Sequence, residues 1–273
     1  MDNSRKLFKA KMVLRGAICG DIIGSAYEWK RTKNYNFNLF TDRSSFTDDT
    51  VCSIAVAESL ITNESLVDTM QKWCRRYPHA GYGGMFRQWI RLANPEPYGS
   101  YGNGSAMRVS AAGAIAQSVE ECLALAEQSA IITHSHPEGI KGAQAVALAI
   151  RMALEDAPKE EIKSEIEERF GYDLSRRYAD IKADYKFQVS CQKSVPEAII
   201  AFLASDDYES TVRRAVALGG DADTQAAIAG GIAAAYYGEI PEYILTECMR
   251  RLPEEMKSVI NKFDSVLEKK YGK

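Results

Sequence analysis

Apolar and small residues recur at helical spacing along almost the whole chain, and this period is the feature that most constrains the fold. The first instance spans residues 6–26, where Gly16, Gly20 and Gly24 lie on one face of a predicted helix. Short strands do not alternate with helices, which disfavours a Rossmann or barrel fold. Alanine and glycine would let core helices approach closely, so the sequence predicts a compact all-α bundle with central helices wrapped by outer ones.

We expect about a dozen helices. They span residues 6–26, 50–61, 64–74, 84–92, 105–117, 120–133, 138–155, 159–170, 195–204, 209–217, 224–237 and 254–269. Ser194, with Pro196 and Glu197 in the first turn, predicts the start of the helix over 195–204. Residues 187–190 form a candidate extended piece. Neither a repeat period nor a low-complexity linker is present, so we expect a single domain over residues 1–273.

The composition excludes some classes of partner. The chain has 34 Lys and Arg against 37 Asp and Glu, a net charge of −3, and no basic block that would indicate a broad nucleic-acid surface. A pocket for a single nucleotide needs only local donors and stays compatible with this charge. The longest apolar run, residues 228–237, is too short and too rich in glycine to span a bilayer. The oligomeric state stays open.

The cysteines indicate a reducing compartment. The six are scattered, with neither a CxxC pair nor zinc spacing, and several lie on apolar helical faces as buried free thiols do. Residues 1–11 are mostly polar and basic, and no apolar signal-peptide stretch follows them. We therefore expect a cytoplasmic protein.

Two segments place paired carboxylates and a threonine hydroxyl at the start of an almost uncharged helix. They are Phe46-Thr47-Asp48-Asp49-Thr50 and Gly219-Gly220-Asp221-Ala222-Asp223-Thr224. Helix capping is one explanation, because Asp and Thr are favoured N-cap residues and a helix N-terminus stabilises negative charge. Capping, however, uses one side chain, and each segment supplies two acids and a hydroxyl.

If the two segments meet in space, four carboxylates share a small volume and raise one another's pKa values. A hard cation removes that repulsion. Carboxylate and hydroxyl oxygens are the ligands that Mg²⁺, Mn²⁺ and Ca²⁺ prefer. The spacing therefore favours a metal site over capping alone.

Two further acids lie near the end of the first predicted helix. Asp21 falls in the helix interior, where a charge needs a partner or a functional reason. Glu28 lies where the helix should end, and it is either a functional acid or a solvated loop residue.

A glycine-rich loop and a histidine pair complete the candidates. The loop is Gly99-Ser100-Tyr101-Gly102-Asn103-Gly104-Ser105-Ala106-Met107-Arg108. Its backbone amides could approach a pyrophosphate and Tyr101 could contact a base or a ribose, although a plain Gly/Asn-rich turn is the alternative. His134 and His136 form a His-x-His pair. With so many carboxylates available, we favour His134 as a hydrogen-bonding pocket residue over a transition-metal ligand. A structural histidine at a helix junction is an equally weighted alternative.

Together and in this order, these segments resemble the ADP-ribosylglycohydrolase family. The matching motifs lie at residues 20–28, 47–50, 101–108, 133–134 and 220–224. The resemblance implies an all-α orthogonal bundle with a binuclear Mg²⁺ or Mn²⁺ site at its centre. Residues 95–100 lack an aspartate that some arginine-directed members carry, and the Ser-Tyr-Gly-Asn-Gly run is closer to serine-directed members.

The resemblance also implies roles for individual residues. The two cations would be held by Thr47, Asp48, Asp49, Asp221, Asp223 and Thr224, with Asp223 as the bridge. The ADP-ribose pocket would be lined by Ser100, Tyr101, Gly102, Asn103, Gly104, Ser105, Met107 and His134. Glu28 is the first candidate for the catalytic acid or base, and Asp48 is the second.

The implied activity is metal-dependent hydrolysis of the bond between ribose C1″ and an acceptor, with release of ADP-ribose from a protein or small-molecule substrate. Two alternatives remain open: an ADP-ribose-binding module with little or no turnover, and a metal-dependent phosphoesterase. The acceptor linkage and the choice between Mg²⁺ and Mn²⁺ also stay open.

Overall fold

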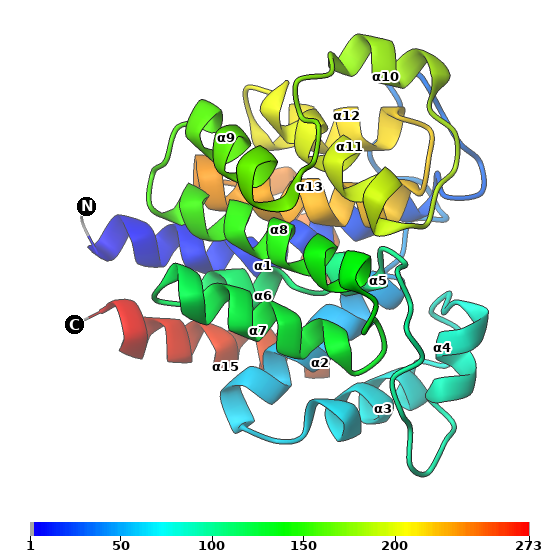
Figure 1. Ribbon diagram of the computed structural model, residues 1–273, viewed down its shortest axis with the longest axis vertical. Helices are drawn as coiled ribbons and strands as arrows, with labels where there is room; N and C mark the ends of the chain where they lie inside the picture. Colours follow the sequence, from blue (N-terminus) through cyan, green and yellow to red (C-terminus); the bar gives the residue numbers. More distant parts are fainter. Residues whose placement is uncertain (1–2, 273) are drawn as a thin grey trace.

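Helices make up the regular secondary structure of residues 3–272, the part of the chain that the computed structural model describes (Figure 1). They are α1 (Asn3–Ser25), α2 (Asp48–Thr62), α3 (Leu66–Arg76), α4 (Gly84–Trp89), α5 (Gly104–Met107), α6 (Ser110–Ile115), α7 (Val119–Ile131), α8 (Pro137–Leu154), α9 (Lys159–Phe170), α10 (Tyr178–Asp184), α11 (Cys191–Leu203), α12 (Tyr208–Ala217), α13 (Ala222–Tyr237), α14 (Glu242–Arg250) and α15 (Glu254–Tyr271). A single antiparallel bridge joins Gly102 to Ser190. The predicted all-α class is confirmed.

Helices α1 and α13 form the centre of the molecule and make the most extensive contact between any two helices described. Glycines of α1 allow this approach: a Cβ atom added at Gly20 would lie 2.0 Å from the carbonyl oxygen of Ala226. A Cβ atom added at Gly16 or at Gly24 would lie 2.4 Å from the nearest atom of α13. The small residues of the sequence pattern therefore lie where two backbones meet.

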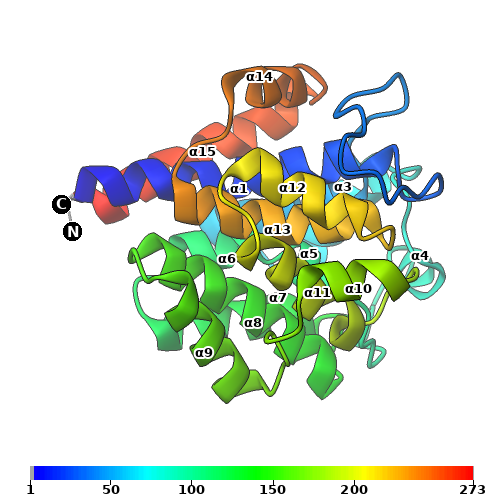
Figure 2. The same cartoon turned by 90° about the horizontal axis from the view of Figure 1, so that it is seen from above.

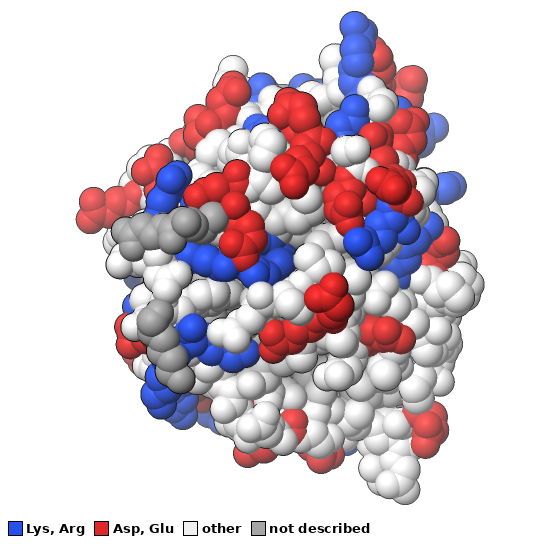
Figure 3. All heavy atoms as spheres, turned by 60° about the vertical axis from the view of Figure 1, so that its left-hand side comes forward, with Lys and Arg blue, Asp and Glu red and all other residues white. Residues whose placement is uncertain are grey.

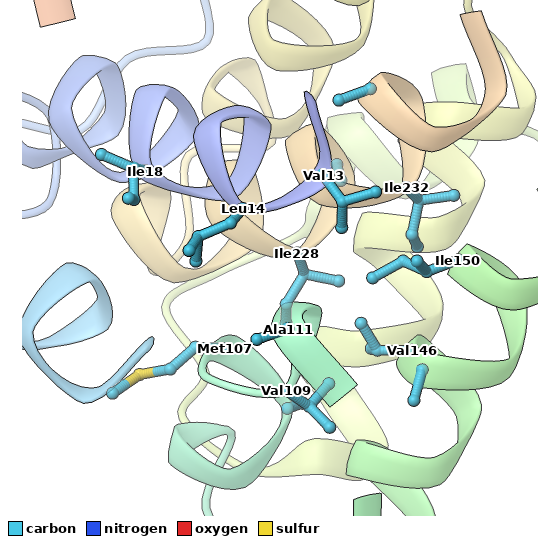
Figure 4. Close-up of a cluster of buried hydrophobic side chains, with 14 of the residues drawn as sticks. Val13, Leu14, Ile18, Met107, Val109, Ala111, Val146, Ile150, Ile228 and Ile232 are labelled. Atoms are coloured by element: carbon cyan, nitrogen blue, oxygen red, sulfur yellow. The ribbon is translucent and has the colours of Figure 1, made fainter. Parts of the chain in front are cut away.

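The other helices surround this pair. Helix α15 packs along α1, and α8, α11 and α12 pack on α13 (Figures 1 and 2). Apolar side chains from α1, α8 and α13 point toward one another in the core shown in Figure 4: Val13, Leu14, Ile18, Val146, Ile150, Ile228 and Ile232. Burying each of the larger ones contributes roughly 1.5–3 kcal/mol.

Local signals set many of the helix ends. The Ser65 and Ser118 hydroxyls accept hydrogen bonds from backbone amides in the first turns of α3 and α7, and Asp207 begins α12 with a capping box. Gly171 and Gly238 end α9 and α13 in the left-handed conformation. These boundaries follow from residues close in sequence.

One predicted helix is interrupted. The helix expected over residues 105–117 is divided into α5 and α6, because Arg108 and Val109 adopt ψ values near zero, −1° and −5°. The buried guanidinium of Arg108 donates to the Ser129 carbonyl at 2.7 Å and to the Thr133 hydroxyl at 2.9 Å. A tertiary contact thus accompanies a break that local propensity does not show.

Other differences lie in the second half of the chain. Helix α11 begins at Cys191, four residues before the predicted start at Val195, so Pro196 lies inside the helix. The Cys191 amide donates to the Tyr101 carbonyl at 2.9 Å, which attaches this earlier start to the glycine-rich loop. Helices α10 and α14 were not predicted.

The surface and the thiols carry few special features. Basic and acidic side chains are interspersed on the face shown in Figure 3. Among the described helices, none combines the length and hydrophobicity that a bilayer span requires. All six cysteines are buried and free.

Replacing Gly20 by alanine is expected to lower the free energy of unfolding by about 2 kcal/mol or more, because the new Cβ would overlap the backbone of Ala226. Denaturant titration measures this loss. Gly83→Ala is the matched control, since Gly83 has φ −59° and nothing lies within 4 Å of an added Cβ. Equal losses in the two variants would contradict the role of Gly20.

Candidate active site

The two acidic segments meet at the start of α13. Asp48 and Asp49 open α2, Asp221 is the N-cap of α13, and Asp223 lies in the first turn of α13. Asp21, from the interior of α1, joins Asp49 and Asp223. The structure therefore brings together four predicted acids and adds Asp21, which the sequence marked only as a buried charge in need of a partner.

Asp21 is fully buried, and its carboxylate holds the start of α2. Oδ1 accepts a hydrogen bond from the Thr47 hydroxyl at 2.6 Å, and Oδ2 accepts from the backbone amides of Thr47 and Thr50 at 2.9 and 3.1 Å. The Thr50 hydroxyl also donates to Oδ2. Burial raises the pKa of Asp21, and these hydrogen bonds oppose the shift. The charge inside α1 thus positions the residues that begin α2.

Asp49 lies between the two threonines predicted as ligands. Its Oδ2 accepts from the hydroxyls of Thr47 at 3.2 Å and Thr224 at 3.4 Å. Its Oδ1 is buried and has no hydrogen-bond partner within residues 3–272. An unpartnered buried carboxylate oxygen is unfavourable unless a donor or a cation satisfies it.

Two groups of three carboxylates have the spacing of a cation site. Oxygens of Asp21, Asp49 and Asp223 lie within 4.8 Å of one another, and so do oxygens of Glu28, Asp221 and Asp223. Asp223 belongs to both groups. Donor sets made only of oxygen suit hard divalent cations. The residues present therefore fit the kind of metal that the sequence suggested.

Burial and mutual repulsion favour the protonated form of these carboxyls. Burial, followed by the charges of neighbouring carboxylates, raises the pKa of Glu28 to about 7 and that of Asp48 to about 8. The pKa values of Asp49 and Asp223 are raised as well, again mainly by burial. The cluster thus combines metal-binding oxygens with groups that can exchange a proton near neutral pH.

These acids line a cavity of about 630 Å³, which is within the size range of small-molecule sites. Seven residues predicted for the ADP-ribose pocket also line it: Ser100, Tyr101, Gly102, Asn103, Gly104, Met107 and His134. Ser105 does not line the cavity. It is fully buried, and its hydroxyl donates to the Gly139 carbonyl at 2.7 Å. Ser105 thus anchors the glycine-rich loop to α8, and a contact of Ser105 with ADP-ribose stays a prediction.

The glycine-rich loop has a shape that requires glycine at particular positions. Gly99 has φ +66°, and a Cβ atom at Gly104 would lie 3.0 Å from Nε2 of His134. From the same loop, the Asn103 side chain donates to Oδ2 of Asp221 at 2.7 Å. This hydrogen bond joins the loop to the acidic cluster, so the two form one continuous wall.

The two histidines of the His-x-His pair lie in different surroundings and have different partners. His134 is buried beside the cavity, with Nδ1 2.7 Å from the Thr133 hydroxyl, and burial lowers its pKa well below the usual value. His136 is the N-cap of α8 and accepts from the Glu138 amide at 3.1 Å. Neither belongs to the candidate metal groups found in residues 3–272. His134 is thus a neutral side chain at the pocket wall.

Aromatic side chains that the sequence analysis did not single out line the rest of the cavity: Trp29, Tyr82, Phe86, Tyr98 and Phe187. Trp29 is 80% exposed and stacks on Phe187 with ring centroids 6.4 Å apart. Phe187 opens the extended piece predicted over residues 187–190, which pairs with the glycine-rich loop through Gly102 and Ser190. The only sequence signal for this wall was the extended piece itself.

Lys33 joins the loop between α1 and α2 to the C-terminal ends of α10 and α12. Its ammonium donates to the carbonyls of Lys182, Tyr185 and Leu218 at 2.5, 2.8 and 2.5 Å. Lys182 and Tyr185 precede Phe187 of the aromatic wall in the sequence. Leu218 precedes the acidic segment at the start of α13. Lys33 itself follows Glu28 in the loop between α1 and α2. One side chain therefore fixes the relative position of these segments.

Comparison with known proteins decides the family. The ADP-ribosylglycohydrolase family profile matches residues 2–272. The chain belongs to the ADP-ribosylglycohydrolase family. ADP-ribosylhydrolase ARH3 of Homo sapiens is 28% identical over 90% of this chain and 90% of its own length. ADP-ribosylhydrolase ARH3 of Danio rerio is 29% identical over 85% of this chain and 83% of its own.

A solved structure titled ADP-ribosylglycohydrolase-related protein complex has the same fold, with a TM-score of 0.71 and 24% identity. The superposition covers 97% of this chain and 99% of that one. The family membership confirms the enzyme class predicted from the sequence: this ADP-ribosylglycohydrolase is a glycosyl hydrolase.

The stability of the metal-free enzyme is expected to fall as pH rises from about 5 to 8. Glu28 and Asp48 have pKa values of about 7 and about 8 in the fold, above the values near 4 of unfolded carboxyls, so the folded state binds more protons in this window. Each extra proton lowers the unfolding free energy by about 1.4 kcal/mol per pH unit.

Denaturant titrations in EDTA measure this slope. Saturating Mg²⁺ should stabilise the fold more at about pH 8 than at about pH 6, since protons compete for the same oxygens. A metal-free protein that becomes more stable over the window would contradict the raised pKa values.

Lys33→Met is expected to reduce metal affinity and kcat/KM by about tenfold or more, because the carbonyls at the ends of α10 and α12 lose their common donor. Lys33→Arg should restore part of both. Metal titration and steady-state kinetics measure the changes. Lys269→Met, at an exposed position on α15, is the matched control. Metal affinity unchanged in Lys33→Met would refute the positioning role.

Proposed function

We propose that this protein is a metal-dependent hydrolase that cleaves the bond between ribose C1″ and the acceptor in an ADP-ribosylated protein or small molecule, releasing ADP-ribose. The main support is the pair of carboxylate groups that share Asp223 beside a cavity of about 630 Å³. The relatives named ADP-ribosylhydrolase ARH3 support the same reaction type.

Two Mg²⁺ or Mn²⁺ ions would be held by the predicted set: Thr47, Asp48, Asp49, Asp221, Asp223 and Thr224. When bound, such ions neutralise the carboxylates and polarise a water molecule and the ribose hydroxyls. The sharing of Asp223 by both carboxylate groups supports its role as the bridge. Asp21 acts differently: both its oxygens accept hydrogen bonds from Thr47 or Thr50, so it orients these residues.

Glu28 is our first choice for the acid or base. It is half-buried at the edge of the acidic cluster, in the loop after α1, and its pKa of about 7 suits proton transfer in either direction. It would deprotonate the attacking water or protonate the departing acceptor atom. Asp48, with a pKa of about 8, is the second candidate and lines the same cavity.

The glycine-rich loop would hold the ADP part of the substrate. Its backbone can approach a diphosphate closely because Gly102 and Gly104 carry no side chain toward His134. Tyr101 is 54% exposed at the cavity wall and offers a ring to a base or a ribose. Asn103 connects this loop to Asp221, so binding of the ADP part also places the ribose beside the acids.

Product analysis over a panel of substrates tests the proposal. The panel contains arginine-linked and serine-linked ADP-ribosyl peptides and O-acetyl-ADP-ribose, each with Mg²⁺, with Mn²⁺ and with EDTA. We expect free ADP-ribose from at least one substrate, with the activity lost in EDTA. Release of AMP or inorganic phosphate would favour a phosphoesterase. Tight ADP-ribose binding without turnover would favour a binding module.

Two substitutions separate the proposed roles. Asp223→Asn should abolish turnover and weaken metal binding, while the metal-free fold becomes more stable, because folding no longer buries a carboxyl whose charged form is disfavoured by burial and by the neighbouring acids. Glu28→Gln should lower kcat by about 10²–10⁴-fold and remove the ionisation near neutral pH from the rate profile. Titration calorimetry and pH-rate measurements supply the readouts. Full activity in either variant would refute the role given to that residue.

A further inference from the structure

A second, basic cavity adjoins the active site along the loop between α1 and α2. Its volume is about 470 Å³, and its lining includes three cations, Lys30, Arg31 and Arg43, with Asp42 as the single acid. The four charged side chains are exposed. Thr32 and Thr41 add hydrogen-bonding groups to the same lining.

The positive charge of this cavity is offset only in part, by Asp42 in its lining and by the interaction of Arg31 with Asp221. Among residues 3–272, salt bridges involve many surface lysines and arginines, but none involves Lys30, Arg31 or Arg43. Three cations without a salt bridge lie around one cavity, in a chain whose net charge is −3. Such a local field attracts carboxylates or phosphates.

The basic cavity and the active-site cavity are lined by neighbouring residues of one loop. Glu28 and Trp29 line the active-site cavity, and the next two residues, Lys30 and Arg31, line the basic one. The Arg31 guanidinium lies 4.5 Å from the ring centre of Phe187 in the aromatic wall. If Glu28 contacts the bond that breaks, an acceptor that leaves the cavity past Trp29 comes close to Lys30 and Arg31, the next residues of the loop.

We propose that this basic cavity binds acidic side chains of an acceptor polypeptide, close in sequence to its ADP-ribosylated residue. The proposal rests on the hydrolase function above and specifies the substrate class. An extended peptide advances about 3.4 Å per residue, so a side chain only a few positions from the modified residue reaches the cations. Arginine and lysine bind carboxylates through charge-assisted hydrogen bonds.

A peptide suits this surface better than a nucleic acid does. Trp29, which lines the active-site cavity and is 80% exposed, offers apolar contact to a peptide backbone and side chains. Asp42 and the net charge of −3 oppose a long polymer with a phosphate at every position. A few carboxylates match three cations without that repulsion.

Kinetics on matched peptides test the proposal. Two peptides carry the same ADP-ribosyl linkage, one flanked by Asp and Glu and the other by Asn and Gln. For the wild-type enzyme we expect the KM of the acidic peptide to be about five- to tenfold lower than that of the neutral peptide. This preference should be lost at about 0.5 M NaCl. In Lys30→Ser/Arg43→Ser the two KM values should become equal. Lys269→Ser should keep the preference.

The outcomes separate the two proposals. Equal KM values of the wild-type enzyme for the acidic and the neutral peptide would overturn the acidic-peptide proposal alone. So would a preference for the acidic peptide that survives in Lys30→Ser/Arg43→Ser. A preference for an ADP-ribosylated oligonucleotide over both peptides would overturn it in favour of a nucleic acid. If no substrate releases ADP-ribose, the proposed function fails. Fluorescence anisotropy with acidic and neutral peptides that carry no ADP-ribose then measures the affinity of each peptide for the protein. Equal peptide affinities would refute the cavity's role.

Discussion

The close approach of α1 and α13 is the constraint on which the site depends. Gly24 lies so near α13 that an added Cβ would be 2.5 Å from Cα of Asp223, the acid shared by both carboxylate groups. One turn earlier, Gly20 meets Ala226, and its neighbour Asp21 reaches the acidic cluster. The same glycine row that packs the core therefore sets the separation between the acids of α1 and those of α13. A wider helix pair would keep the fold but lose this spacing.

Concentrating carboxylates in a buried volume opposes stability, and hydrogen bonds limit that effect for two of the acids. Hydrogen bonds from Thr47, Thr50 and Asn103 stabilise the charged forms of Asp21 and Asp221. Other acids remain under-satisfied: Oδ1 of Asp49 has no partner among the described residues, and pKa values in the cluster are raised. Full satisfaction within the protein would leave no oxygen for a cation, so this residual repulsion is what makes the cluster suited to bind one.

The sequence predicted those parts of the site that depend on local chemistry. Paired acids and threonines at two helix starts, and glycines at positions without room for a Cβ, are recognisable one segment at a time. The hydrogen bond from Ser105 to the Gly139 carbonyl was not predicted, because it depends on a helix distant in sequence. The break at Arg108 and the aromatic wall at Phe187 likewise depend on tertiary contacts. Asp21 lies between these cases: its burial was expected, but not its partners.

Some residues of the site lie on helices and others lie in loops, and this difference matches their proposed roles. The candidate metal ligands lie at helix starts packed on the core, where backbone positions are fixed by the fold. Glu28, Trp29 and Phe187 lie in loops, whose positions depend on a few long-range bonds such as those of Lys33. Rigid elements suit ligands, because metal geometry tolerates little displacement. Loops tolerate substitution, so the acceptor side can change between relatives while the metal side stays the same. Acceptor choice in this fold is therefore expected to be set by the loop between α1 and α2 rather than by the helices.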